Sequence, residues 1–560
     1  MRNQSQTQNS KAANSSQKSN QQIAGKDVAH ESAIKHVSGI AQYIDDIAEP
    51  ADLLHVAIGK SDVACGIVRQ LDLEDVLKQA GVRAVISFND IIGLDDIGPV
   101  FPGDPLFVNQ EIKFHGQPLF AVAADSLDQA RRAVAFAKIV IEEKPALLNA
   151  REAVKQNRLV RPDHQMKQGD ADEALEKSPH VLNSSLEIGG QEHYYLEGQA
   201  SLAIPTEDQG ILVHCSTQHP SEVQKLIAEV LDIPFNSVTV ETRRMGGGFG
   251  GKETNAAQWA CIASILTVKT KRSVKLRLPR ADDMIMTGKR HPFSNDYQIG
   301  FDHEGKILAA KIKVIGDCGC SPDLSDAIVD RAMFHSDNAY FLPIAEIKGH
   351  RAFTNKVSNT AFRGFGGPQG MMTIEGAMDD IARYLGEDPL DIRKRNLYSD
   401  ESNRNITPYG QTVNCASLKR VVEELEICSN YRQRKQSIVE YNQENTHFKK
   451  GLALTPVKFG ISFTVQHLNQ AGALLHIYTD GSVHLNHGGT EMGQGLNTKV
   501  AQIVAEELQI NLDQVYISAT RTDKVPNTSP TAASSGTDLN GQAAKNAAQK
   551  IKKRRIKLLQ

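Results

Sequence analysis

Two stretches of the chain repeat the same order of apolar and polar positions at a distance of 277 residues. Residues 223–240 (VQKLIAEVLDIPFNSVTV) and 500–517 (VAQIVAEELQINLDQVYI) each predict an amphipathic helix, a short break and an alternating strand. Upstream of each copy, residues 200–218 and 472–490 predict two strands around a tight turn. The repeated order predicts a duplicated α/β fold, and a pocket between two related halves is a favoured place for a large ligand.

Changes in polarity divide the rest of the chain into a tail, a small domain and a linker. Residues 1–26 are mainly Gln, Asn, Ser and Lys, which predicts a disordered tail. Residues 27–145 alternate short strands and helices and predict a small α/β domain, in which Ser126 and Gln129 have the capping-box spacing for a helix over 126–139. The polar stretch 146–175 is interpreted as a linker, and the two related domains are assigned to residues 176–400 and 401–560.

Four loops of small residues each precede a predicted helix. Glycine lets backbone N–H groups approach a ligand closely, and a helix N-terminus adds partial positive charge. The loops are divided between the two halves, which favours one large, polar, anionic ligand held between them. They cover residues 246–251, 364–367, 487–495 and 529–536.

The first of these loops also satisfies the phosphate-binding pattern G-x-x-x-x-G-K at residues 246–252. The next residue, Glu253, stands where that motif needs a Ser or Thr hydroxyl for magnesium. A carboxylate there would repel phosphates, so a nucleotide triphosphatase is the weaker hypothesis.

Composition narrows the class of protein further. The 560 residues predict three or four domains, and the formal net charge of −3 favours neither nucleic acid nor an anionic membrane as partner. No apolar run is long enough to span a bilayer. The seven cysteines are sparse, lack a C-x-x-C pair and fit a reducing cytoplasm, and Cys318 and Cys320 are interpreted as ordinary residues at a strand end.

Read in order, the loops and several further segments resemble the molybdenum-binding subunit of the xanthine dehydrogenase (molybdenum hydroxylase) family. The similarity extends over nearly all of the chain after about residue 27, and several motifs are long. The resemblance implies a small α/β hammerhead domain followed by two related α/β domains that bind molybdopterin. The motifs are GIAQYIDDI (39–47), GGQEHYYLE (189–197), RRMGGGFGGKE (243–253), DRAMFH (330–335), TAFRGFGGPQG (360–370), KFGISFT (458–464), GTEMGQG (489–495) and SPTAAS (529–534).

The same resemblance implies which residues surround the cofactor. Backbone amides and side-chain donors would hold the ligands of the metal without a covalent bond from the protein. The residues implied next to molybdenum are Gln191, Phe249, Arg363 and Ala533, and those implied to bind the rest of the cofactor are Gly250, Gln494, Ala532 and Ser534.

For the substrate, the resemblance implies a purine, hypoxanthine or xanthine, oxidised towards urate with oxygen from water. Glu253 and Arg331 would face each other across a pocket and bind the ring N–H groups and oxygens of the purine. Phe365 and Phe463, with Thr464, would form an aromatic slot around the ring. Relatives that oxidise aldehydes differ at the Glu and Arg positions.

Electron transfer would need another polypeptide, because the chain lacks the cysteine sets that iron–sulfur clusters require. The resemblance implies an iron–sulfur and FAD subunit, with NAD as the acceptor, in a hetero-oligomer with a dimerised core.

The sequence departs from the family near its end. The family's general-base glutamate belongs to a G-E-P-P motif that does not occur here, so no catalytic residue is assigned and the second domain is predicted to be incomplete. The basic stretch 543–560 (AAKNAAQKIKKRRIKLLQ) is interpreted first as a consequence of truncation, ahead of a nucleic-acid patch or a solvated helix. Three hypotheses follow: a purine hydroxylase subunit, a hydroxylase of aldehydes or other N-heterocycles, and a catalytically silent truncated relative.

Overall fold

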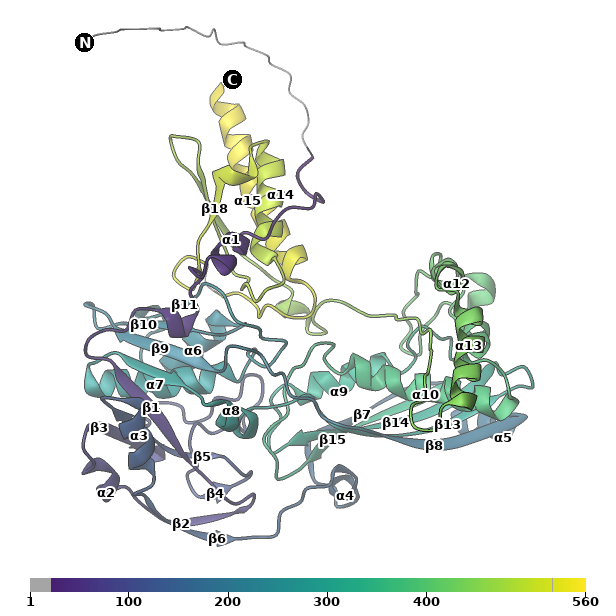
Figure 1. Ribbon diagram of the computed structural model, residues 1–560, viewed down its shortest axis with the longest axis horizontal. Coiled ribbons are helices and arrows are strands. Elements are labelled where there is room, and N and C mark those ends of the chain that lie inside the picture. Colours follow the sequence, from purple (N-terminus) through teal and green to yellow (C-terminus); the bar gives the residue numbers. More distant parts are fainter. Residues whose placement is uncertain (1–21, 526, 560) are drawn as a thin grey trace.

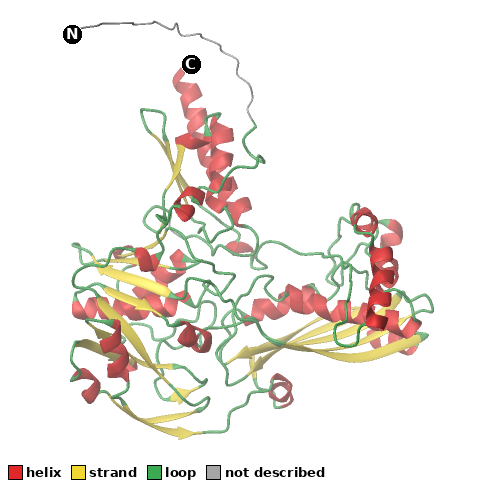
Figure 2. Cartoon of the chain, in the orientation of Figure 1, coloured by secondary structure: helices red, strands yellow, loops and turns green. Residues whose placement is uncertain are grey.

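The computed structural model describes residues 22–525 and 527–559, whose elements form three lobes (Figure 1). One lobe contains the N-terminal strands and the first repeat, the second contains a long sheet, and the third contains the C-terminal helices. Each lobe combines helices with strands (Figure 2), so the α/β fold class is confirmed.

An eight-stranded sheet joins the hammerhead domain to the first repeat. The pairing that joins the two parts is parallel, with Leu54 of β1 opposite Val274 of β12. Helix α7 packs on this sheet and is buried around most of its circumference, as expected for a helix with apolar residues on every side. The strand order is β19 (Thr520–Arg521), β11 (Val238–Thr242), β10 (Ile211–Cys215), β9 (Ala200–Pro205), β12 (Val274–Arg277), β1 (Leu54–Lys60), β5 (Pro118–Ala124) and β3 (Val82–Ser87); the helices of this lobe are α2 (Glu74–Leu77), α3 (Leu127–Val134), α6 (Pro220–Leu231), α7 (Ala256–Thr270) and α8 (Arg280–Met286).

The helix predicted after Ser126 forms but is shorter than expected. The Ser126 hydroxyl accepts a hydrogen bond from the Gln129 amide, which confirms the predicted cap, and α3 ends at Val134. The residues that follow form β6 (Lys138–Glu143), which pairs with β2 (Gly66–Asp72) in a small sheet completed by β4 (Glu111–Ile112). Their alternating side chains fit a strand better than the end of a helix.

The linker prediction for residues 146–175 is wrong, because most of this segment is regular structure. It contains α4 (Ala150–Lys155), β7 (Leu159–Gln168) and the start of α5 (Ala171–Glu176). Asn149 and Asp170 cap the two helices through their side chains. Strand β7 lies at the edge of a sheet and is only partly buried. Its sequence is therefore polar and did not predict a strand.

That sheet has five strands and carries a second core. Helices α9 and α10 lie along it in Figure 1, and their buried side chains meet those of β13 and β14. Val422 of α12 and Tyr431 of α13 belong to the same core, so the predicted boundary at residue 401 divides one packing unit. The elements are β7, β15 (Ala345–Phe353), β14 (Ile307–Gly319), β13 (Phe293–Phe301) and β8 (His180–Ile188), with α9 (Ser325–Phe334), α10 (Gly367–Leu385), α11 (Pro389–Asn396), α12 (Leu418–Cys428) and α13 (Tyr431–Glu444).

The C-terminal lobe confirms the predicted repeat. Strands β9 and β10 form an antiparallel hairpin and β11 adds in parallel after α6; β16 and β17 form a hairpin and β18 adds in parallel after α14. Both helices end in a left-handed residue, Asp232 with φ 53° and Gln509 with φ 57°, at equivalent positions of the repeat. The elements of this lobe are β16 (Ala473–Ile477), β17 (Val483–His487), β18 (Val515–Ile517), α14 (Leu496–Leu508) and α15 (Gly536–Leu559).

The second copy differs from the first at one edge. In the first copy, α7 is followed by β12, which pairs antiparallel with β9. Within the ranges that the structure describes, β16 has no strand at the corresponding edge.

Regular contacts begin before residue 26, where the predicted disordered tail ends. Residues 22–26 fall in the predicted disordered tail, yet the Ile23 and Ala24 amides donate to Oε2 of Glu506 at 3.0 and 2.7 Å. Residues 1–21 lie outside the described part of the chain. The short helix α1 (Ala33–Val37) then lies between the C-terminal lobe and the first repeat (Figure 1).

Two further predictions concern the cysteines and the length of the apolar helices. Cys318 and Cys320 are buried at the end of β14 and form no disulfide. Across the described ranges, none of the helices has both the length and the apolar character needed to cross a bilayer.

Gly370→Ala is expected to destabilise the contact between α9 and α10. A Cβ at Gly370 would lie 2.0 Å from the carbonyl oxygen of Ala332, which is backbone and cannot move aside easily. We expect a loss of about 1–3 kcal/mol in the free energy of unfolding, measured by urea denaturation. The matched control is Gly376→Ala in the same helix, where the nearest atom is 3.8 Å away. It should gain up to about 1 kcal/mol, and equal losses in both variants would contradict the assigned packing.

Candidate functional site where four loops meet

The side chain of Gln218 joins the glycine loop of the first half to the last loop of the second half. Gln218 lies between β10 and α6 and is 2% exposed. Its Oε1 accepts hydrogen bonds from the amides of Gly250 at 2.9 Å and Lys252 at 3.4 Å. Its Nε2 donates to the carbonyl of Thr531 at 3.1 Å, and its own carbonyl accepts from the Thr531 amide at 2.9 Å. One amide side chain therefore holds both loops at a fixed spacing.

The first two predicted loops are in direct contact. Phe249 has φ 54° and Gly250 has φ 103°, and the Phe249 carbonyl accepts from the Arg363 amide at 2.8 Å. A Cβ at Gly250 would lie 2.6 Å from the Ala361 carbonyl oxygen. Glycine is required at 250 by this close approach, as well as by its positive φ.

The third loop binds the fourth. The Thr490 amide donates to Oγ1 of Thr531 at 2.8 Å. Gln494 stabilises its own loop, because its Nε2 donates to the Thr490 carbonyl at 3.0 Å and its Oε1 accepts from the Met492 amide at 2.7 Å. The Met245 amide donates to the Glu491 carbonyl at 2.9 Å, which ties this loop back to the first half.

The segment 458–464 completes the arrangement. The Ser462 amide donates to the Ala533 carbonyl at 2.8 Å. Arg331 on α9 donates through Nη1 to the Gly460 carbonyl at 2.5 Å and through Nη2 to the Ser462 carbonyl at 2.6 Å. Hydrogen bonds thus connect the loops that carry Phe249 and Arg363 to those that carry Gln494 and Ala533, and a cavity shared by these four residues stays a prediction.

Gln191 and Gln218 have different places in this arrangement. Oε1 of Gln191 accepts from Nε of Arg290 at 2.6 Å, and Nη2 of Arg290 donates to the Arg363 carbonyl at 2.9 Å. Gln191 is exposed and reaches the second loop through Arg290, whereas Gln218 contacts loops of both halves directly. Gln218 was not among the residues predicted from the sequence; its position between β10 and a helix that begins with a proline was the available signal.

Glu253 is a buried acid. It is 5% exposed, and its carboxyl group makes no hydrogen bond with any residue of the described ranges. Burial, with smaller contributions from the Glu222 and Asp323 carboxylates, raises the pKa of Glu253 to about 8. The protonated form therefore predominates at neutral pH, which corrects the expected carboxylate.

Arg331 is also buried, at 5% exposure, and burial lowers its pKa from the ordinary value. Its guanidinium carbon lies 5.8 Å from the ring centre of Phe365 and 5.6 Å from that of Phe459. Phe459, which sequence analysis did not select, shares Arg331 with the predicted Phe365. No ion pair links Arg331 to Glu253 in the described chain, so their placement on opposite walls of one pocket stays a prediction.

The remaining predicted residues are more open. Phe463 is half-buried, its amide donates to Oδ1 of Asn469 at 2.9 Å, and Thr464 is exposed. Ala532 and Ala533 are half-buried and Ser534 is exposed; Ala533 and Ser534 have φ values of 57° and 56°. These two left-handed residues form the sharp bend of the fourth loop.

The site fits an anionic cofactor such as molybdopterin. The amides of Phe249 and Ala533 donate to no described residue, and the exposed guanidinium of Arg363 likewise has no partner within the described ranges. A Cβ at Gly493 would meet nothing within 4 Å. Helices α10, α14 and α15 begin at these loops, so their N-termini add partial positive charge. Over the described residues, no three His, Cys, Asp or Glu side chains gather to hold a metal, so the available groups are donors.

Three family models match successive parts of the chain. Residues 38–145 match the a/b hammerhead domain of aldehyde oxidase and xanthine dehydrogenase. Residues 151–397 and 424–560 each match a molybdopterin cofactor-binding domain. Curated relatives include xanthine dehydrogenase of Dictyostelium discoideum, 42% identical over 94% of this chain, and xanthine dehydrogenase/oxidase of Gallus gallus, 41% identical over 95%.

The chain belongs to the xanthine dehydrogenase (molybdenum hydroxylase) family. It spans about two fifths of the length of these relatives, 38% of the Dictyostelium protein and 39% of the Gallus protein.

Solved structures of this fold are also similar to the chain. Quinoline 2-oxidoreductase of Pseudomonas putida 86 superposes with a TM-score of 0.84 at 23% identity, covering 95% of this chain and 71% of that one. Aldehyde oxidoreductase of Desulfovibrio gigas gives a TM-score of 0.82 at 23% identity, covering 94% and 60%. At this identity the comparison establishes the molybdenum hydroxylase fold for the chain.

Gln218→Ala is expected to loosen the contact between the two halves. The variant leaves the Gly250 amide and the Thr531 carbonyl without their partner, which costs about 1–3 kcal/mol. Hydrogen exchange should speed up in residues 246–252 and 528–533 together. Gln433→Ala on the exposed face of α13 is the control and should leave both segments unchanged. Faster exchange in only one segment would contradict the bridging role.

Glu253→Gln is expected to stabilise the protein at alkaline pH. The pKa of Glu253 is raised from 4.5 in the folded protein, so stability is lost as pH rises through about 8, and the neutral amide avoids this loss. The difference in Tm should be small near pH 4.5 and reach roughly 2–6 °C around pH 9. Glu207→Gln in an exposed turn is the control. A Tm difference that does not depend on pH would show that Glu253 is ionised throughout.

Proposed function

We propose that this chain provides the molybdopterin site and the substrate pocket of a purine hydroxylase that oxidises hypoxanthine and xanthine towards urate. This proposal rests on the loops that converge from both halves. In these loops, Phe249 and Ala533 have left-handed backbone conformations, and their amides have no partner among the described residues. The names of the curated relatives, xanthine dehydrogenases, support the substrate class.

The cofactor would lie between the loops that Gln218 connects. When bound, the molybdenum cofactor accepts two electrons and supplies hydroxylation chemistry with water as the oxygen source. The Phe249 and Ala533 amides and the Arg363 guanidinium donate to its anionic groups. Gly250, Gln494, Ala532 and Ser534 shape the loops around it. Gln191 orients Arg290, which in turn holds the Arg363 carbonyl.

The substrate would contact Glu253 and Arg331. As a neutral acid, Glu253 can donate a hydrogen bond to a ring nitrogen or oxygen of the purine and accept one from a ring N–H. The Arg331 guanidinium is already oriented by two carbonyls, and it stabilises negative charge that develops on the ring. Phe365 and Phe463, with Thr464, would enclose the ring by offset stacking.

Electrons would leave through an iron–sulfur and FAD subunit to NAD, in a cytoplasmic hetero-oligomer with a dimerised core. A general base would come from polypeptide outside the 560 residues, since no residue of the chain is assigned that role. The open edge of β16 in the second copy supports such a completion, because the equivalent edge of β9 is covered by β12.

Two alternatives have different consequences. A hydroxylase of aldehydes or other N-heterocycles would bind the same cofactor but would not depend on Glu253. A catalytically silent relative would bind no molybdenum, or would bind it without turnover even when partner subunits are present.

The first test is the molybdenum content of the chain after expression in cells that make molybdopterin. We expect about one molybdenum per chain by elemental analysis, and less than half of this for Arg363→Ala. Arg420→Ala, on the exposed surface of α12, is the matched control. Absence of molybdenum from the wild-type chain would contradict the proposal.

The second test is xanthine turnover after the chain is completed with its partner subunits. Glu253→Ala should lower kcat/KM for xanthine by about 10²–10³-fold while molybdenum content stays near the wild-type value. Glu207→Ala should leave both unchanged. Equal loss of molybdenum and turnover in Glu253→Ala would refute the substrate role, and turnover of aldehydes alone would favour the second hypothesis.

A further inference from the structure

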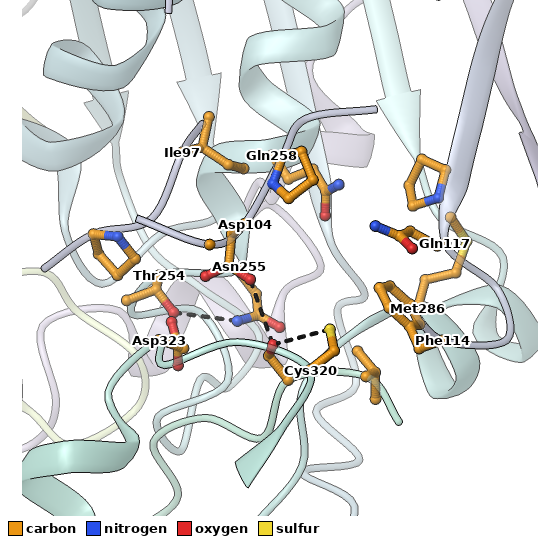
Figure 3. A pocket seen from close by; sticks show the side chains of 16 residues that line it. Ile97, Asp104, Phe114, Gln117, Thr254, Asn255, Gln258, Met286, Cys320 and Asp323 are labelled. Carbon is orange, nitrogen blue, oxygen red and sulfur yellow. Dashed lines mark hydrogen bonds between the residues drawn. The ribbon is translucent and has the colours of Figure 1, made fainter. Parts of the chain in front are cut away.

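A small cavity lies where the hammerhead domain meets the first cofactor-binding domain (Figure 3). The space open to water within it is about 70 Å³, so the cavity is large enough to hold ordered water. The polar side chains that line it include those of Asp104, Thr254, Asp323 and Ser358.

Two buried carboxyl groups in this cavity lack a hydrogen-bond partner on one oxygen. Asp323 is 5% exposed, and its Oδ2 has no partner within the described chain. Oδ2 of Asp104 is likewise buried and unpaired, whereas its Oδ1 accepts from the Ser321 and Ser358 hydroxyls. An unpaired buried oxygen is costly, so each of these atoms requires a partner such as water.

Burial, with a smaller contribution from neighbouring carboxylates, raises the pKa of both groups above the ordinary value for aspartate. Burial raises the pKa of Asp104 to about 6, with Asp96 raising it further and the Ser hydroxyls and Lys113 opposing this. Burial and the Asp104 carboxylate raise the pKa of Asp323 to about 7 against hydrogen bonds from Thr254 and Thr360. Among the described residues, the titratable groups that act on this cluster are Asp96, Lys113, Glu253 and Cys320, of which Lys113 is the cation.

The cavity adjoins the proposed substrate residue Glu253. Thr254, the next residue, lines the cavity, and its hydroxyl lies 3.2 Å from that of Thr360. The Thr254 and Thr360 hydroxyls lower the pKa of Asp323, and the Asp323 carboxylate contributes to the raised pKa of Glu253. Hydroxyl and carboxyl groups thus line the cavity beside the residue that follows Glu253 in the chain. The hammerhead loop that carries Asp104 also carries the exposed Pro102.

We propose that Asp323 and Asp104, joined by water in the cavity, carry protons from the pocket at Glu253 to solvent along the boundary of the two domains. The inference rests on the proposed function. Hydroxylation converts a ring C–H and one water into C–OH, releasing two protons and two electrons. The electrons pass to the acceptor of the iron–sulfur and FAD class, and the protons must leave a buried pocket separately.

The pathway predicts an infrared signature in the chain itself. We expect C=O bands of protonated carboxyl groups that persist at pH 5 and disappear between about pH 6 and 8. Asp323→Asn should remove one band and shift the titration of the Glu253 band to lower pH, because a neighbouring negative charge is gone. The control Asp208→Asn, in an exposed turn, should change neither. Complete ionisation by pH 5, or an unshifted Glu253 band in Asp323→Asn, would overturn the pathway.

The completed holoenzyme supplies the second readout. Asp323→Asn and Asp104→Asn should each lower kcat by about tenfold and increase the solvent isotope effect, at unchanged molybdenum content and KM. Asp323→Glu, which keeps a titratable group, should restore most of the rate. Full activity of Asp323→Asn would overturn the proton pathway alone. A wild-type holoenzyme without hydroxylase activity would instead overturn the proposed function, together with the inference that rests on it.

Discussion

The amide of Gln218 is the constraint on which the rest of the site depends. Its oxygen accepts a hydrogen bond from Gly250 and its nitrogen donates one to Thr531, and these two residues lie 281 positions apart in the chain. An amide cannot satisfy both contacts unless the two halves keep one spacing. Since Phe249 and Ala533 are held in left-handed backbone beside these contacts, their free N–H groups are directed before any ligand binds.

Burial at the boundary of the two domains sets the protonation of the acids. Strand β1 of the hammerhead domain pairs with β12, so the loop that carries Asp104 is fixed against the first cofactor-binding domain. Asp104, Asp323 and Glu253 are withdrawn from water by this contact, and the cost of burying a charge favours their neutral forms. The same packing that joins the domains therefore determines which groups can donate or carry protons.

The sequence predicted what depends on local periodicity and on glycine. The repeat was visible because α6 and α14 keep the same apolar spacing, and the four loops were visible as runs of small residues before helices. Strand β7 was missed because an edge strand buries little of its surface. Gln218 was missed because its role arises from contacts hundreds of residues apart, and the protonation of Glu253 follows from burial that no local pattern records.

Hydrogen exchange of the chain with and without bound molybdopterin tests the central claim most directly. If one cofactor lies between the two halves, binding should slow exchange in residues 246–251 and 360–367 of the first half and in residues 489–495 and 529–535 of the second half, all at the same ligand concentration. Protection confined to the loops of one half would contradict a shared site.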